Sequence, residues 1–227
     1  FSPDEEKKLN GKRMGKFDRN TLNCSWNIKI WIFSQNYHGF KLAIFASGRG
    51  SNAKAILLFQ SQANYEVALI VVSRSEALVA DLARAKGLPL VVLEKERFQH
   101  ESVLLESLKE YGIELICLAG FLWKIPDYLI KAFPERILNI HPSLLPKYGG
   151  KGMYGSKVHE AVVASGEKES GITIHLVNEE YDKGQILFQK SIPLDPAESS
   201  ESLGKRILAI EHQHYPRVIH RYISEHF

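Results

Sequence analysis

From Lys41 onward, short apolar runs alternate with amphipathic segments along the chain. Short runs rich in valine, isoleucine and leucine are typical of buried parallel strands, and amphipathic segments between them are typical of crossover helices. The alternation therefore predicts a Rossmann-like α/β domain with a doubly wound, mostly parallel sheet. The predicted strands are Leu42–Ala46, Val67–Val72, Leu90–Leu93, Leu115–Leu118 and Ile137–Ile140. The predicted helices are Ala53–Gln60, Leu78–Lys86, Gln99–Tyr111 and Asp127–Phe133.

After Gly155 the pattern changes. Two further apolar strands are separated by the turn-forming residues Asp182-Lys183-Gly184, so we expect them to form an antiparallel pair. The serine-rich segment 199–202 offers N-cap oxygens for a closing amphipathic helix that runs past Glu211 toward Ile223. The other elements predicted here are a helix at Ser156–Ser165 and strands at Gly171–Val177 and Ile186–Pro193.

The first 40 residues differ in composition from the rest of the chain. A charged opening is followed by a cluster of tryptophan, isoleucine and phenylalanine without clear helix caps, and the chain begins with Phe1 rather than Met. We therefore expect residues 1–40 to be an extension of unassigned role, either disordered or not native to the protein. The catalytic domain is predicted to cover residues 41–227.

The overall composition narrows the class of protein. A length of 227 residues is enough for one domain with a complete core. The net charge of +3 is mild and the basic residues are dispersed, so no nucleic-acid partner is expected. No window approaches the run of about 18 apolar residues that a membrane span needs. Of the two cysteines, Cys117 lies inside an apolar run, which is typical of a reduced thiol in a cytoplasmic protein.

A glycine-containing loop follows the first predicted strand and opens the first predicted helix. Its sequence, Ser47-Gly48-Arg49-Gly50-Ser51-Asn52, would leave free backbone N–H groups facing an anion, although such loops also serve simple strand-to-helix packing. No Gly-Lys-Ser/Thr follows, and Ser73-Arg74 replaces the acidic residue of a dinucleotide site, so a single phosphate monoester fits better than NAD. Arg97 is either a second phosphate contact or a solvated surface residue.

Two polar residues end the fifth predicted strand. Asn139 and His141 are two residues apart, so they project from the same side of the strand toward the edge where open α/β sheets bind ligands. A lone histidine at a strand end is more often structural than catalytic. The nearby amide, the two prolines that fix the following loop and the later acidic turn at Asp182 together favour a catalytic site.

Four motifs of the chain resemble those of a known enzyme family. Asn139–Pro146 (NIHPSLLP), Leu118–Phe121 (LAGF), Gly171–Val177 (GITIHLV) and Tyr181–Gly184 (YDKG) closely resemble the phosphoribosylglycinamide formyltransferases among the folate-dependent formyltransferases. The resemblance runs from Lys41 to about Ile219. It implies transfer of a formyl group from the cosubstrate 10-formyltetrahydrofolate to the amine of glycinamide ribonucleotide in purine biosynthesis.

The resemblance implies three catalytic residues. Amine attack on the formyl carbon creates an oxyanion and requires a proton to reach the leaving folate nitrogen. Asn139 would donate a hydrogen bond to the oxyanion. His141 would donate to the same oxygen or act as the general acid, and Asp182 would hold the imidazolium or a water that relays the proton.

The resemblance also implies two binding sets. The ribonucleotide would be held by Gly50, Ser51, Asn52, Arg97 and Glu211, and the folate by Phe121, Leu122, Trp123, Lys124 and Ile125. Trp123 stands where some members of the family carry arginine, so Lys124 is the candidate for contact with the folate tail. No metal site is expected, because His212 and His214 are spaced i, i+2 and lie on different faces of a helix.

Three alternatives remain, of which the first two share this chemistry. Methionyl-tRNA formyltransferase would need a further C-terminal domain. Formyltetrahydrofolate deformylase would need an N-terminal regulatory domain, and it typically has histidine rather than Pro142 after the key histidine. A folate- or nucleotide-binding module without catalysis would not require all three polar residues. We expect small-molecule partners only, in a monomer or homodimer.

Overall fold

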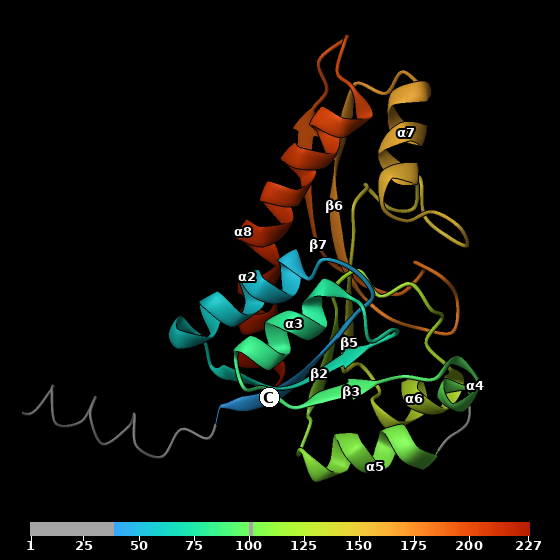
Figure 1. Cartoon of the computed structure of the whole chain (residues 1–227). Helices are drawn as coiled ribbons and strands as arrows, with labels where there is room; N and C mark the ends of the chain where they lie inside the picture. Colours follow the sequence, from blue (N-terminus) through green and yellow to red (C-terminus); the bar gives the residue numbers. More distant parts are fainter. Residues whose placement is uncertain (1–38, 100–101) are drawn as a thin grey trace, which may run out of the picture. The chain divides into compact units, whose positions relative to one another are not determined.

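The computed structural model describes residues 39–99 and 102–227, in which the strands pair into one sheet (Figure 1). The strands are β1 Phe40–Ala46, β2 Tyr65–Val72, β3 Leu90–Val92, β4 Leu115–Leu118, β5 Ile137–His141, β6 Glu169–Leu176 and β7 Ile186–Pro193. Their order is β3-β2-β1-β4-β5-β6-β7. Neighbouring strands are parallel from β3 to β5, while β6 pairs antiparallel with both β5 and β7. The predicted fold class is confirmed.

The helices follow the predicted alternation with one clear difference. They are α2 Ser51–Phe59, α3 Leu78–Ala85, α4 Lys95–Phe98, α5 Ser102–Glu110, α6 Asp127–Ala132, α7 Ser156–Ala164 and α8 Ser200–His226, with a short 3₁₀ helix at Gln60–Gln62. The helix predicted over Gln99–Tyr111 corresponds to α5, but Gln99 and Tyr111 form turns, and residues 100 and 101 lie outside the described part of the chain. The short helix α4 was not predicted.

Side chains alternate across the sheet, so the parallel strands contribute to two separate cores. Leu42 and Ile44 of β1 pack with buried residues of α2, α3, α7 and α8. Ala43 and Phe45 of the same strand pack with buried residues of α4, α5 and α6. Helices therefore cover both faces of the parallel part of the sheet (Figure 1). Because β1, β4 and β5 run parallel, the loops that follow them lie at the same edge of the sheet.

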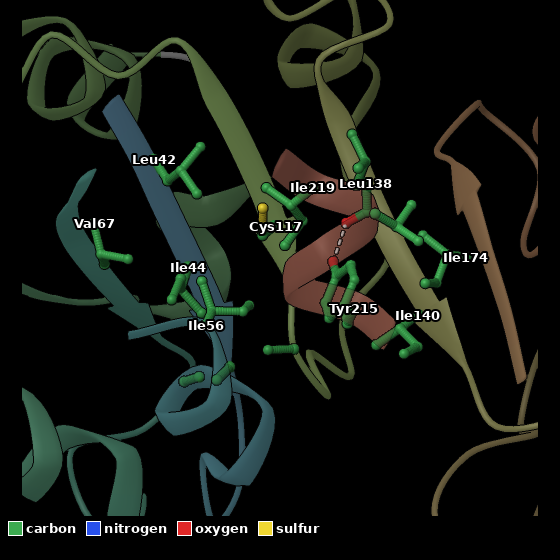
Figure 2. Close-up of a cluster of buried hydrophobic side chains, with 14 of the residues drawn as sticks. Leu42, Ile44, Ile56, Val67, Cys117, Leu138, Ile140, Ile174, Tyr215 and Ile219 are labelled. Atoms are coloured by element: carbon green, nitrogen blue, oxygen red, sulfur yellow. Dashed lines mark hydrogen bonds between the residues drawn. The ribbon is translucent and has the colours of Figure 1, made fainter. Parts of the chain in front are cut away.

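Tyr215 of α8 places a fully buried side chain with a hydroxyl group in the first core (Figure 2). Its oxygen lies 3.0 Å from the carbonyl oxygen of Leu118 and 3.0 Å from that of Leu138. These residues belong to β4 and β5, the two strands whose following loops carry candidate site residues. The tyrosine therefore ties α8 to the centre of the sheet.

Replacing Tyr215 with phenylalanine should lower the free energy of unfolding by about 1–3 kcal/mol, because the buried carbonyls lose their donor. Urea denaturation of both proteins measures the difference. Tyr181→Phe is the matched control, since Tyr181 is 40% exposed and its change should stay within about 0.5 kcal/mol. Equal stability of the two variants would contradict the structural role of the Tyr215 hydroxyl.

Gly39–Phe227 form one compact unit. The predicted extension over residues 1–40 lies, except for its last two residues, outside the described part of the chain, as does Cys24. The Cys117 thiol is free and buried on β4, and burial raises its pKa. Within residues 39–99 and 102–227, no helix has both the length and the apolar character needed to cross a membrane.

Candidate active site

A cavity of about 890 Å³ opens beside the carboxyl ends of β1, β4 and β5. The sheet order reverses direction between β1 and β4, and ligands of open α/β sheets bind at such a switch point. Asn139, His141 and Asp182 all line this cavity. The structure thus brings the three predicted catalytic residues together from a strand end and a distant turn.

Asn139 is held by a histidine on the neighbouring strand. In the β5–β6 ladder it lies opposite His175, and its Nδ2 is 3.0 Å from Nε2 of that ring. The other ring nitrogen, Nδ1, lies 2.7 Å from the carbonyl oxygen of Leu176 and donates its proton there. In the neutral ring Nε2 consequently accepts from the Asn139 amide, which leaves a second N–H of Asn139 for a ligand. His175 thus supports the orientation of the Asn139 amide.

The imidazole of His141 is fixed on both sides. Its Nε2 lies 2.8 Å from the carbonyl oxygen of Tyr148, to which it donates, and its Nδ1 lies 3.7 Å from Oδ2 of Asp182. Burial lowers the pKa of His141, and this outweighs the raising effects of Asp182 and the Tyr148 carbonyl. At neutral pH the ring is therefore neutral, with the basic Nδ1 directed toward the carboxylate.

Asp182 is held by a strained turn. Its φ of 56° is in the left-handed region, which is uncommon for a residue other than glycine and recurs at functional sites. Oδ2 accepts a hydrogen bond of 2.8 Å from the Gly150 N–H, and Oδ1 lies 3.6 Å from Nε2 of His175. Burial raises the pKa of Asp182, but His175, His141 and the Gly150 N–H together bring it below its ordinary value.

The cavity therefore contains an ionised carboxylate beside a neutral, buried imidazole. Such pairs are typical of general acid–base sites, because the carboxylate stabilises the imidazolium that forms when the ring takes up a proton. Asn139 adds an uncharged donor on the same strand. Together the three groups can stabilise a developing oxyanion and accept or release a proton.

Only part of the predicted phosphate loop lines the cavity. Gly50 caps α2 with a φ of 74°, and a Cβ there would lie 2.6 Å from Cβ of Val79, so only glycine fits. Asn52 lines the cavity, and so does Arg49, which the sequence analysis did not select. Gly50, Ser51 and Arg97 are not among the lining residues. The Arg97 Nε lies 3.1 Å from Oε2 of Glu94 on the exposed surface of α4.

Glu211, predicted to contact the sugar, forms a buried pair with Asn52. Its Oε2 accepts a hydrogen bond of 2.7 Å from Nδ2 of Asn52. Among residues 39–99 and 102–227, the buried Oδ1 of Asn52 has no hydrogen-bond partner. Burial raises the pKa of Glu211 to about 7, against a lowering effect of the Asn52 amide. The Asn52–Glu211 pair in the cavity lining thus combines a buried acceptor that lacks a partner with a desolvated carboxyl, which suits hydroxyl donors on a ligand.

The raised pKa of Glu211 predicts a pH-dependent stability. The folded protein binds the proton of the Glu211 carboxyl more tightly than the unfolded chain does. The carboxyl therefore destabilises the fold increasingly as the pH rises from the ordinary pKa of a glutamate toward 7. Relative to Glu211→Gln, the wild type should lose on the order of 3 kcal/mol of unfolding free energy between pH 4 and pH 8. Urea unfolding of both proteins at the two pH values tests this. Parallel pH profiles would contradict the assignment.

The predicted folate segment also borders the cavity. Phe121, Leu122, Trp123, Lys124 and Ile125 all line it. Trp123 packs against Phe121 and Phe98, with ring centroids 6.0 and 5.6 Å apart. The Leu122 N–H donates to Oγ of Ser47, so this backbone donor is already used inside the protein. The segment offers an apolar, aromatic wall with Lys124 as its cation.

Several lining residues were not among the predicted site residues. They come from the glycine-rich segment 148–155, the turn between β6 and β7, and helices α7 and α8, and they include Lys151, Met153, Tyr154, His159, Tyr181, Ser200, Gly204 and Leu208. One signal was available. Ser200, Gly204, Ile207 and Glu211 recur at helical spacing, which marks one face of α8. Within the described residues, no group of three or more His, Cys, Asp or Glu side chains is arranged to hold a metal.

Comparisons with known proteins agree with this geometry. Residues 40–219 match the formyl transferase family. The chain is 45% identical over 186 residues to the chloroplastic phosphoribosylglycinamide formyltransferase of Arabidopsis thaliana, covering 79% of this chain and 64% of that protein. The match therefore spans less than two thirds of the plant relative.

Bacterial relatives are matched over most of their length. The phosphoribosylglycinamide formyltransferase of Bacillus subtilis is 37% identical, over 79% of this chain and 92% of its own. Glycinamide ribonucleotide transformylase 1 from Symbiobacterium toebii superposes with a TM-score of 0.75 at 32% identity, covering 83% of this chain and 89% of that one. The sequence, the fold and the cavity lead to one conclusion: the chain belongs to the formyl transferase family.

Proposed function

We propose that this protein transfers the formyl group of 10-formyltetrahydrofolate to the amine of glycinamide ribonucleotide. The observation that carries the proposal is the convergence of Asn139, His141 and Asp182 in one cavity, which Asn52 of the glycine-containing loop and the aromatic segment 121–125 also line. The names of the relatives from Arabidopsis and Bacillus support the choice of substrates.

The reaction joins the amine nitrogen to the formyl carbon. The formyl oxygen becomes an oxyanion, the carbon–nitrogen bond to the folate then breaks, and the folate nitrogen leaves with a proton. Asn139 donates to the oxyanion. His141 accepts the proton that the attacking amine loses and returns it to the folate nitrogen as that bond breaks, and the ionised Asp182 stabilises the imidazolium that exists in between. Proton transfer of this kind lowers barriers by roughly 3–5 kcal/mol.

The test combines the protein with glycinamide ribonucleotide and a 10-formyl folate, and follows release of the deformylated folate. Turnover should depend on the amine. Equal turnover with water as acceptor would favour a deformylase, and transfer only to methionyl-tRNA would favour the tRNA enzyme. Ligand binding without turnover would identify a non-catalytic module.

We further propose that the partners are these small molecules, without nucleic acid, and that the protein is a monomer or homodimer. Sedimentation of the purified chain measures its mass. The cytoplasm is the predicted compartment, whereas the Arabidopsis relative is named as chloroplastic. Imaging of a C-terminal fluorescent fusion distinguishes the cytoplasm from plastids.

A further inference from the structure

One wall of the cavity has no role in the mechanism above. It is built from α7 and the first half of α8, which pack against each other. α8 contributes a single face that ends at Glu211, and α7 contributes Ser156 and His159. His159 is the titratable side chain that α7 places in the lining.

The His159 ring lies close to the backbone of α8. A Cβ placed on Gly204 would lie 3.1 Å from Cδ2 of the ring and 3.4 Å from its Nε2. Contacts this short leave no room for a larger residue unless the ring moves. Gly204 thus allows the imidazole to lie between the two helices at the cavity wall.

The surroundings of the ring select one tautomer. Nδ1 of His159 is buried and has no hydrogen-bond partner among residues 39–99 and 102–227. A buried N–H without an acceptor is costly, so the proton of the neutral ring belongs on Nε2. Burial, together with the nearby His141, lowers the pKa of His159, which keeps the ring uncharged. The wall consequently carries a neutral N–H donor.

The position of the ring indicates which ligand it meets. Gly204 precedes Glu211 by seven residues, which is about 10 Å along a helix. The Glu211–Asn52 pair and the His159 ring therefore lie on the same wall, and the folate segment 121–125 belongs to a different one. His141 lies close enough to His159 to lower the pKa of that ring. We therefore expect a ligand whose sugar is at Glu211 and whose amine reaches His141 to lie within reach of His159.

We propose that His159 binds the nucleotide substrate, donating its Nε2–H to an oxygen of the arm that carries the reacting amine. This assignment rests on the proposed function. The hydrogen bond would orient the amine toward the formyl carbon without adding a charge beside the neutral His141. His159 would bind substrate and take no part in proton transfer.

The experiment measures steady-state kinetics of His159→Leu and His159→Gln with both substrates varied. Loss of one hydrogen bond should raise KM for glycinamide ribonucleotide by about tenfold in the leucine variant. KM for the folate and the pH profile of kcat should stay unchanged, and glutamine, which retains an N–H donor, should restore most of the affinity. His212→Leu is the matched control, because His212 on α8 also has a buried, unpartnered ring nitrogen within the described chain but does not line the cavity.

The possible failures can be told apart. Absence of amine-dependent turnover in the wild type would overturn the proposed function and this assignment with it. A normal wild-type reaction with an unchanged nucleotide KM in His159→Leu would overturn the assignment alone. Equal changes in KM for both substrates, or in His159→Leu and His212→Leu alike, would show that the ring serves packing only.

Discussion

Replacing Asp182 with asparagine is expected to lower kcat by about 100- to 10,000-fold, the usual range for loss of a general acid–base function. The carboxylate lies 3.7 Å from Nδ1 of His141, and it raises the pKa of that ring against the opposing effect of burial. Without the negative charge, the imidazolium that forms during transfer would be buried and unpaired. KM for the ribonucleotide should change little, because Asp182 stabilises the imidazolium of the transition state and does not bind the ground-state substrate.

The pH dependence of kcat is a second, independent test of Asp182→Asn. Since Asp182 raises the pKa of His141, its loss should move the acid limb of the kcat profile to lower pH. Glu179→Gln removes the same charge from an exposed position on the same connection and is the matched control. A higher KM with normal kcat would show that Asp182 binds substrate and has no part in proton transfer.

The regular part of the fold could be predicted because its signals are local. The buried strand Leu115–Leu118 is a continuous apolar run, and such a run between amphipathic segments fits few arrangements other than a parallel sheet. Asn139 and His141 could be paired for the same reason, since the period of a strand is two residues. The short helix α4 could not be predicted, because its four residues are too few to show a helical period.

The contacts that complete the site depend on register and loop paths. Asn139 meets His175 because β5 and β6 pair with these two residues opposite each other. The pairing of β6 with β7 has a register shift at the same place, between Ile174 and His175. The carbonyl of Tyr148 reaches His141 through the course of a loop. Both contacts depend on how distant segments pack together. No single segment of the sequence shows a pattern that predicts them.

The second large effect is expected at Asn139. Alanine at this position should lower kcat by about 100- to 1,000-fold, the usual loss when one donor to an oxyanion is removed. One amide N–H of Asn139 is engaged by His175, and the other is available to the cavity. Asn64→Ala is the matched control, because Asn64 also pairs with a histidine, His220, but outside the cavity lining. Retention of kcat within threefold in Asn139→Ala would refute the oxyanion role.

A double-variant comparison separates direct action of Asn139 from an effect through His175. If Asn139 served only to hold the His175 ring, Asn139→Ala combined with His175→Ala would be no slower than His175→Ala alone. If Asn139 donates to the oxyanion, adding its loss to His175→Ala should lower kcat further, toward the same 100- to 1,000-fold range. The ring of His175 would then position the donor, and the amide of Asn139 would be the group that contacts the reacting oxygen.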